Sequence, residues 1–186
     1  MSFPLCYMLI GPPGCGKSTL ARHWIEYFPD TVWISTDAIR EKLYGDVRIQ
    51  GDWSTIEAEF LQQTQAALSH QRSILYDATN ARPDWRIDIL QNVQRHQPQD
   101  IQVQWMGWVF QMPLAVCKLR NQMRDRQVDE AVIEQLHHGL EEHPPSIAEG
   151  FAAIHSVPMT GNAFDFETIN LLIHTLQVSI STPLVP

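Results

Sequence analysis

A short apolar run ends at a glycine- and proline-rich loop that leads directly into a helical pattern. Residues 6–10 are continuously apolar, and the segment 11–18 reads Gly-Pro-Pro-Gly-Cys-Gly-Lys-Ser. This segment satisfies the spacing G-x-x-x-x-G-K-[ST], in which backbone N–H groups surround a phosphate, the lysine reaches the β and γ phosphates, and the hydroxyl ligates Mg²⁺. The sequence therefore predicts a nucleotide phosphate loop, with binding residues Gly11, Gly14, Cys15, Gly16, Lys17, Ser18 and Thr19. We interpret Cys15 as a small loop filler rather than a nucleophile.

The rest of the chain alternates between short apolar runs and patterns with helical spacing. We expect strands at 6–10, 32–35, 73–76 and 101–110, a possible strand at 154–157, and helices at 18–28, 37–44, 55–70, 83–96 and 130–142. A further helix, opened by Pro113, is expected to carry residues 117–125. Residues 166–176 fit either a helix or a strand. This alternation predicts an α/β chain with a five-stranded, mainly parallel sheet between helices. With 186 residues, the chain is long enough for one domain, 1–186, with a helical lid at about 115–145.

The cysteines and the apolar segments limit where such a protein functions. Three cysteines with wide spacing and no C-x-x-C pair argue against a disulfide framework or a zinc finger. The apolar run near the start is too short for a membrane span and follows no basic residue. We expect a reducing, cytoplasmic location with no membrane association.

Basic residues are confined to the first two thirds of an acidic chain. The net charge is −8, yet all 13 Lys and Arg lie between Lys17 and Arg126, and residues 127–186 contain none. Four of them, with only Asp125 of opposite charge among them, are Lys118, Arg120, Arg124 and Arg126. Such local crowding favours phosphate binding. A step of four predicts Arg120 and Arg124 on one helix face, with Arg124 as the lid cation over the nucleotide phosphates; the alternative is a solvated basic helix face.

Other groups favour a kinase among the proteins with such a loop. The sequence contains no Asn-Lys-x-Asp stretch that reads guanine, and it is too short for the added domains of most motor ATPases. Asp37 ends the second predicted strand and Arg40 follows three residues later. The carboxylate can accept a proton from an attacking hydroxyl, and the guanidinium can hold an anion on the acceptor. The alternative makes Asp37 a helix N-cap and Arg40 a surface residue.

Two polar residues follow the third predicted strand. Asp77 stands where a carboxylate can hold the Mg²⁺ shell together with Ser18, although an Asp at this position also forms turns. Asn80 can orient the loop, contact the acceptor, or form an Asx turn. These residues are predicted to complete a phosphate-transfer site at the carboxyl edge of the sheet.

Four segments together resemble the phage and bacterial polynucleotide 5′-kinases and their wider group of small P-loop kinases, which includes zeta-toxin-like and antibiotic-phosphorylating enzymes. The segments are 11–19, 35–40, 76–80 and 120–128, within a match over about 5–155. The resemblance implies ATP as donor, Lys17 and Ser18 on the phosphates and Mg²⁺, Asp37 as general base, Arg40 on the acceptor phosphate, and Arg124 as the lid arginine.

The chain departs from this group in two ways. We expect no appended phosphatase or ligase domain, and the tryptophans, most of which we expect in the core, are not interleaved with basic residues except at 85–86. A long single strand needs a basic groove with stacking aromatics. The acceptor can therefore be a nucleotide end, a short oligonucleotide or a small hydroxyl metabolite.

Two hypotheses follow. The first is an ATP-dependent phosphotransferase that moves the γ-phosphate to an acceptor hydroxyl, as a polynucleotide 5′-kinase or as a small-molecule kinase. The second is an ATP-binding switch or regulatory ATPase that acts through a protein partner, with the acidic residues 127–186 as the partner surface. The second hypothesis gives Asp37 and Arg40 no function. The two hypotheses are distinguished by whether ATP turnover depends on an added hydroxyl acceptor.

Overall fold

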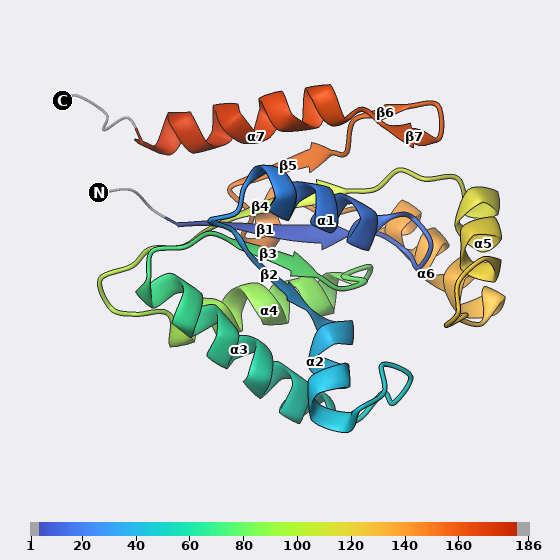
Figure 1. The fold of residues 1–186 in the computed structure, drawn as a ribbon, viewed down its shortest axis with the longest axis horizontal. Helices are drawn as coiled ribbons and strands as arrows, with labels where there is room; N and C mark the ends of the chain where they lie inside the picture. The colour runs from blue at the N-terminus through green and yellow to red at the C-terminus, as the bar shows by residue number, and fades with distance from the viewer. Residues whose placement is uncertain (1–3, 182–186) are drawn as a thin grey trace.

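The computed structural model describes residues 4–181, which form a parallel sheet between two layers of helices (Figure 1). The five strands lie in the order β2-β3-β1-β4-β5, and every neighbouring pair is parallel. Their bounds are β1 (Leu5–Ile10), β2 (Val32–Ser35), β3 (Ile74–Asp77), β4 (Gln104–Val109) and β5 (Ala153–Ser156). The predicted five-stranded sheet is confirmed.

Helices cover both faces of this sheet. One face carries α1 (Lys17–Tyr27) and α7 (Phe166–Ser181), and the other carries α3 (Trp53–Ser69) and α4 (Pro83–His96), with α2 (Thr36–Tyr44) beside them (Figure 1). The paired helices α5 (Leu114–Gln122) and α6 (Glu130–Glu142) lie beyond the carboxyl ends of the strands (Figure 1). A short 3₁₀ turn, η1 (Ile147–Glu149), follows α6.

The central strand β1 shows why the chain adopts this arrangement. All six of its residues are buried, and alternate side chains enter different hydrophobic clusters. Tyr7 and Leu9 pack with Trp24 of α1, whereas Met8 packs with Phe60 of α3. A strand buried on both faces requires a continuous apolar run, which is what the sequence contains. The same burial puts the loop after β1 at the centre of the carboxyl edge, where open α/β sheets bind ligands.

Two strand regions differ from the sequence-based expectation, and one open alternative is resolved. Strand β4 is shorter than 101–110, because the Ile101 N–H donates to the Pro98 carbonyl in a turn, 3.0 Å away. Residues 166–176, which fitted helix or strand, are helical. A small antiparallel hairpin, β6 (Met159–Thr160) and β7 (Ala163–Phe164), was not predicted.

Helix α5 ends at Gln122 instead of continuing to residue 125, and the predicted extent is wrong. The reason is the buried side chain of Asn121, which accepts from the Val128 N–H at 2.9 Å and donates to the Val128 carbonyl at 2.8 Å. These two bonds close a tight loop over 123–129. Arg124 therefore lies in that loop and not on a helix face with Arg120.

No helix in the described part of the chain is both long enough and apolar enough to cross a membrane.

Candidate active site

The phosphate loop requires its glycines at two positions. Gly14 and Gly16 adopt φ angles of +83° and +108°, a region that side chains disfavour. A Cβ at Gly14 would lie 2.2 Å from the backbone oxygen of Cys117, and one at Gly16 would lie 2.6 Å from the Phe164 ring. The loop is thus pressed closely between α5 and the β6–β7 hairpin.

Lys17, the first residue of α1, folds over this loop. Its Nζ donates to the carbonyl oxygens of Gly11 at 2.8 Å and of Pro12 at 3.0 Å. Cys15 is fully buried beneath Gly11, and burial raises the pKa of its thiol. A thiol with a raised pKa carries little thiolate at neutral pH, which agrees with a packing role.

Asp77 and Ser18 are brought together next to Lys17. Asp77 is the last residue of β3 rather than a turn residue, and it is 5% exposed. Burial raises the pKa of this carboxyl, while the Lys17 charge and the Ser18 hydroxyl lower it and the Asp37 charge raises it further. Its Oδ2 accepts no hydrogen bond within the described chain. A buried carboxylate oxygen without a partner beside a serine hydroxyl fits a hard divalent cation such as Mg²⁺.

Asp37 is not the helix N-cap. Ser35 occupies that position, and its hydroxyl accepts from the Ala38 N–H. Asp37 instead accepts two charged hydrogen bonds on Oδ1, at 3.1 Å from Arg40 and at 2.7 Å from Arg126. Its Oδ2 has no partner among the residues described, and the side chain is 47% exposed. One carboxylate oxygen is therefore oriented by two arginines while the other remains accessible.

Arg40 is not a surface residue. Its side chain is only 13% exposed, and besides Asp37 it bonds the Gln50 carbonyl, with Nε 3.4 Å from that oxygen. Arg40 thereby joins α2 to the segment 45–52 that connects α2 with α3.

The arginines of the lid segment occupy three different environments. Arg120 donates to the carbonyl oxygens of Cys15 at 3.3 Å and of Asn162 at 2.7 Å, so it connects the phosphate loop to the hairpin. Arg124 is exposed; its backbone N–H donates to the Asn121 carbonyl at 3.2 Å, and its guanidinium has no hydrogen bond or ion pair among the described residues. Arg126 extends to Asp37. Sequence reasoning grouped Arg126 with the others and missed this pairing across 89 residues.

Asn80 orients the loop after β3. It is 3% exposed with φ of +48°, and its side-chain amide donates to the Leu9 carbonyl at 2.8 Å. Of the roles left open by the sequence, the structure favours loop orientation.

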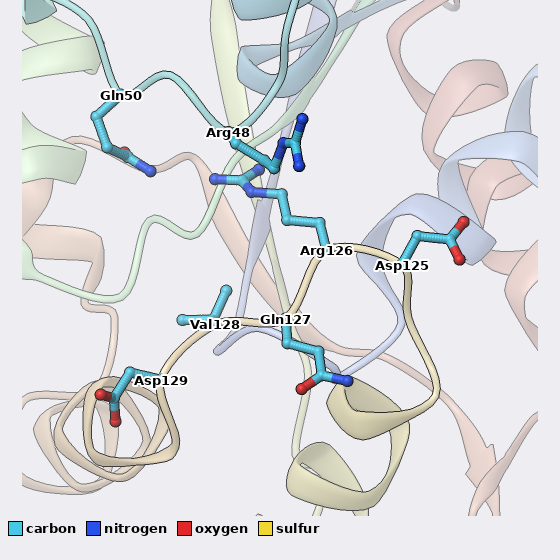
Figure 2. A pocket seen from close by; sticks show the side chains of 7 residues that line it. All are labelled: Arg48, Gln50, Asp125, Arg126, Gln127, Val128 and Asp129. Carbon is cyan, nitrogen blue, oxygen red and sulfur yellow. The ribbon is translucent and has the colours of Figure 1, made fainter.

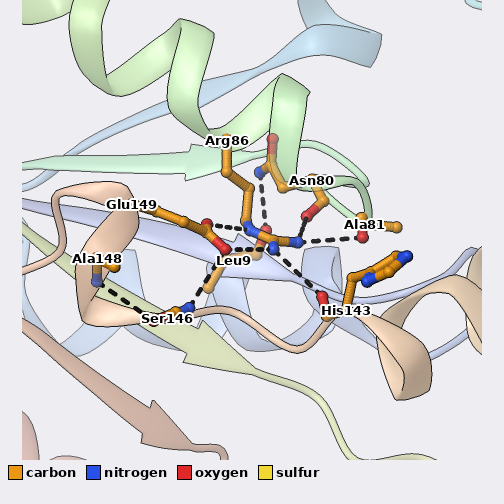
Figure 3. A network of polar contacts seen from close by, with 8 residues as sticks. All are labelled: Leu9, Asn80, Ala81, Arg86, His143, Ser146, Ala148 and Glu149. Carbon is orange, nitrogen blue, oxygen red and sulfur yellow. Dashed lines mark hydrogen bonds and ion pairs between the residues drawn. The ribbon is translucent and has the colours of Figure 1, made fainter.

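A second network was missed entirely (Figure 3). Arg86 is fully buried and makes a bidentate ion pair with Glu149 at 2.6 and 2.7 Å. The same guanidinium donates to the carbonyl oxygens of Asn80, Ala81 and His143. It thus holds the loop after β3 against the segment that follows α6. The only sequence signal is a Ser-x-x-Glu capping box at 146–149, which also forms.

A pocket of about 400 Å³ opens between the segment 45–52 and the loop 123–129 (Figure 2). Its lining residues are Arg48, Gln50, Asp125, Arg126, Gln127, Val128 and Asp129. Since Arg126 also contacts Asp37, the pocket lies directly beside that carboxylate.

The geometry agrees with the comparisons to known proteins. The model of the AAA domain family matches residues 7–143, well over half of the chain. The chain belongs to the AAA domain family. No protein with a curated description matches the sequence significantly.

Several solved structures share the fold of this AAA domain. A chain of the Pnkp1/Rnl/Hen1 RNA repair complex is 22% identical over 76% of this chain and 45% of that chain, with a TM-score of 0.62. A fungal RNA kinase is 16% identical over 95% of this chain and 44% of that chain, with a TM-score of 0.67. The tunicamycin resistance protein of Deinococcus radiodurans is 16% identical over 92% and 95% of the two chains, with a TM-score of 0.61.

This AAA domain spans less than half the length of the two RNA-related chains and nearly all of the tunicamycin resistance protein. The family match and the shared fold agree with the predicted P-loop fold. Some of the matched structures, such as the fungal RNA kinase, carry a kinase name.

Proposed function

We propose that this protein is an ATP-dependent phosphotransferase that moves the γ-phosphate to an acceptor hydroxyl, in the manner of a polynucleotide 5′-kinase. The observation that carries the proposal is the state of Asp37. Two arginines bind one of its carboxylate oxygens, the other has no partner among the described residues, and the charge of Asp37 acts on Asp77 next to Lys17 and Ser18. A general base needs this combination of fixed orientation and a free lone pair.

Each step of phosphate transfer is assigned to particular residues of the chain. Loop amides and Lys17 bind the β and γ phosphates, and Ser18 and Asp77 hold Mg²⁺. Bound MgATP supplies the electrophilic phosphoryl group. Asp37 accepts the proton of the acceptor hydroxyl on Oδ2 and orients that hydroxyl toward the γ-phosphate. Arg120 and Arg124 are the lid cations that neutralise charge on the phosphates.

The polynucleotide acceptor is favoured over a small molecule because RNA repair and RNA kinase chains are among the structures with this fold. The second candidate is a small-molecule kinase, which the tunicamycin resistance protein favours because its length matches this chain. A regulatory ATPase acting through a protein partner leaves Asp37 unused. The three free, buried cysteines support a cytoplasmic location.

The test is transfer of labelled γ-phosphate from ATP with Mg²⁺ to a panel of 5′-hydroxyl DNA and RNA oligonucleotides, nucleosides and small hydroxyl metabolites. Lys17→Ala serves as the blank. Labelling of oligonucleotide ends is the expected result. Labelling of small molecules alone would replace the polynucleotide acceptor, and hydrolysis that is independent of any acceptor would refute the proposed kinase.

A further inference from the structure

Two buried polar atoms without a hydrogen-bond partner belong to neighbouring strands of the sheet. One is the indole Nε1 of Trp33 in β2, and the other is Oδ2 of Asp77 at the end of β3. Neither atom has a hydrogen bond to any part of the chain that the structure describes. A buried donor or acceptor that stays unpaired costs free energy, so each such atom in a native fold requires an explanation.

The strand register brings these two side chains close together. In the parallel pair of β2 and β3, Trp33 lies opposite Leu75 and Ser35 lies opposite Asp77. Since side chains alternate between the two faces of a strand, Trp33 and Asp77 are diagonal neighbours on one face. An aromatic side chain can span such a diagonal. Trp33 and Leu75 belong to the hydrophobic cluster that the sheet forms with α1, so this face is the one that α1 covers (Figure 1).

The indole group is near enough to act on the carboxylate. Burial, the largest influence, raises the pKa of the Asp77 carboxyl, and the Trp33 indole N–H is among the groups that lower it. An indole nitrogen donates a hydrogen bond but accepts none. Trp33 can therefore orient the Asp77 carboxylate without becoming a ligand of the cation.

The Asp77 carboxylate has room for both a cation and the indole. Its two oxygens are chemically equivalent and together offer about four lone-pair sites. Carboxylates that ligate metal ions are themselves hydrogen-bonded, and those bonds set their orientation. The uncharged donors that act on Asp77 are the Ser18 hydroxyl and the Trp33 indole N–H, and Ser18 is itself a proposed ligand of Mg²⁺. The indole is thus the donor that can orient Asp77 while the cation is bound.

We infer that Trp33 is a positioning residue, whose indole N–H holds the Asp77 carboxylate in the orientation that ligates Mg²⁺. This inference rests on the proposed function, in which Ser18 and Asp77 hold the cation, and it adds a residue from outside the phosphate loop. Trp33 precedes the proposed general base, Asp37, by four residues. Its bond to Asp77 therefore joins the strand that leads to the base with the strand that ends at the metal ligand.

The first test is the ¹H–¹⁵N NMR spectrum of the six tryptophan indole groups, recorded without nucleotide. Trp33→Phe identifies the Trp33 signal. That signal should move upfield in Asp77→Asn, because an amide oxygen is a weaker acceptor than a charged carboxylate. The signals of Trp24 and Trp108, whose Nε1 atoms are also buried without a partner among the residues described, should keep their positions. A Trp33 signal that is unchanged in Asp77→Asn would overturn the inference.

The second test separates positioning from packing by calorimetry of ADP binding, with Mg²⁺ and with EDTA. Trp33→Phe should weaken binding about tenfold with Mg²⁺ and leave it unchanged in EDTA, because loss of a metal ligand's hydrogen-bond partner typically lowers metal affinity by about that factor or more. Trp108→Phe, which removes a buried indole from the same hydrophobic cluster, is the matched control and should leave the effect of Mg²⁺ unchanged.

Two results of the calorimetry would overturn the inference. One is wild-type affinity of Trp33→Phe for ADP with Mg²⁺, and the other is an equal loss of affinity with Mg²⁺ and in EDTA, which indicates packing alone. Failure of the proposed function gives a different result. If the Mg²⁺-dependent loss occurs but the wild type transfers phosphate to no acceptor, the kinase function is refuted and the role of Trp33 stands.

Discussion

Removal of the buried guanidinium of Arg86 should destabilise the protein strongly. Arg86→Met keeps most of the side-chain volume but removes both hydrogen bonds to Glu149 and three bonds to backbone carbonyls. The Glu149 side chain is 9% exposed, so its charge is left buried and without its cation. Breaking a buried ion pair in this way costs about 3–5 kcal/mol.

That cost is large relative to the whole stability of a domain, which is about 5–15 kcal/mol. For a chain of 186 residues it lowers the melting temperature by roughly 6–20 °C. The assay is urea denaturation followed by circular dichroism. A double-mutant cycle with Glu149→Gln should return a coupling energy of about 1–3 kcal/mol, because each residue is the other's main partner.

The control is Arg82→Met at the start of the same helix α4. Arg82 also pairs with an acid, Asp84, but both side chains are more than half exposed, and solvent screens the pair. Its denaturation midpoint should stay close to that of the wild type. If Arg86→Met costs no more than Arg82→Met, the network in Figure 3 does not stabilise the junction between the loop after β3 and the end of α6.

Three further predictions concern the site and its support. Asp37→Asn should lower kcat about 100-fold or more with ATP affinity retained, because a general base acts on the acceptor; lost ATP affinity with normal transfer would contradict this role. Asp77→Asn should raise the melting temperature at neutral pH and abolish Mg²⁺-dependent protection by ATP. The raised pKa means that the unfolded chain loses its Asp77 proton at lower pH than the folded one, so stability falls as pH rises through the folded pKa. The increase in melting temperature should vanish at a pH below the ordinary carboxyl pKa. An increase that persists at that pH would refute burial of the Asp77 charge as its cause. Gly14→Ala should weaken ATP binding because its Cβ would overlap the Cys117 backbone, whereas Gly139→Ala, with open space inside α6, should stabilise the chain by about 0.5–1 kcal/mol; calorimetry with ATP and thermal melts distinguish the two.

Local pattern was enough to predict the sheet and the phosphate loop. The strands β1 and β3 at the centre of the sheet are short apolar runs buried on both faces. The spacing from Gly11 to Ser18 specifies a loop that Lys17, at the start of the next helix, bonds through the carbonyl oxygens of Gly11 and Pro12. Asp37 and Asp77 could be identified because each lies at the carboxyl end of a predicted strand.

Local pattern was not enough for the lid. A helical periodicity that continues to residue 125 cannot show that Asn121 turns back to bond Val128 and ends the helix. That single contact moves Arg124 into an exposed loop and directs Arg126 to Asp37. The N-cap interpretation of Asp37 failed for a similar reason, since Ser35 and Asp37 are both good caps and only the backbone geometry selects Ser35.

The sequence by itself determined the order of the strands β1 to β5 and the helices α1 to α6 along the chain, the phosphate loop and the positions of the carboxylates at strand ends, because these depend on residues close together in the chain. Tertiary structure alone decided which charges meet. Arg86 and Glu149 are 63 residues apart, and Asp37 and Arg126 are 89 apart. Their pairing depends on how α4, α6 and the lid loop pack around the sheet. The pocket between Arg48 and Arg126 exists only because that packing brings two loops face to face.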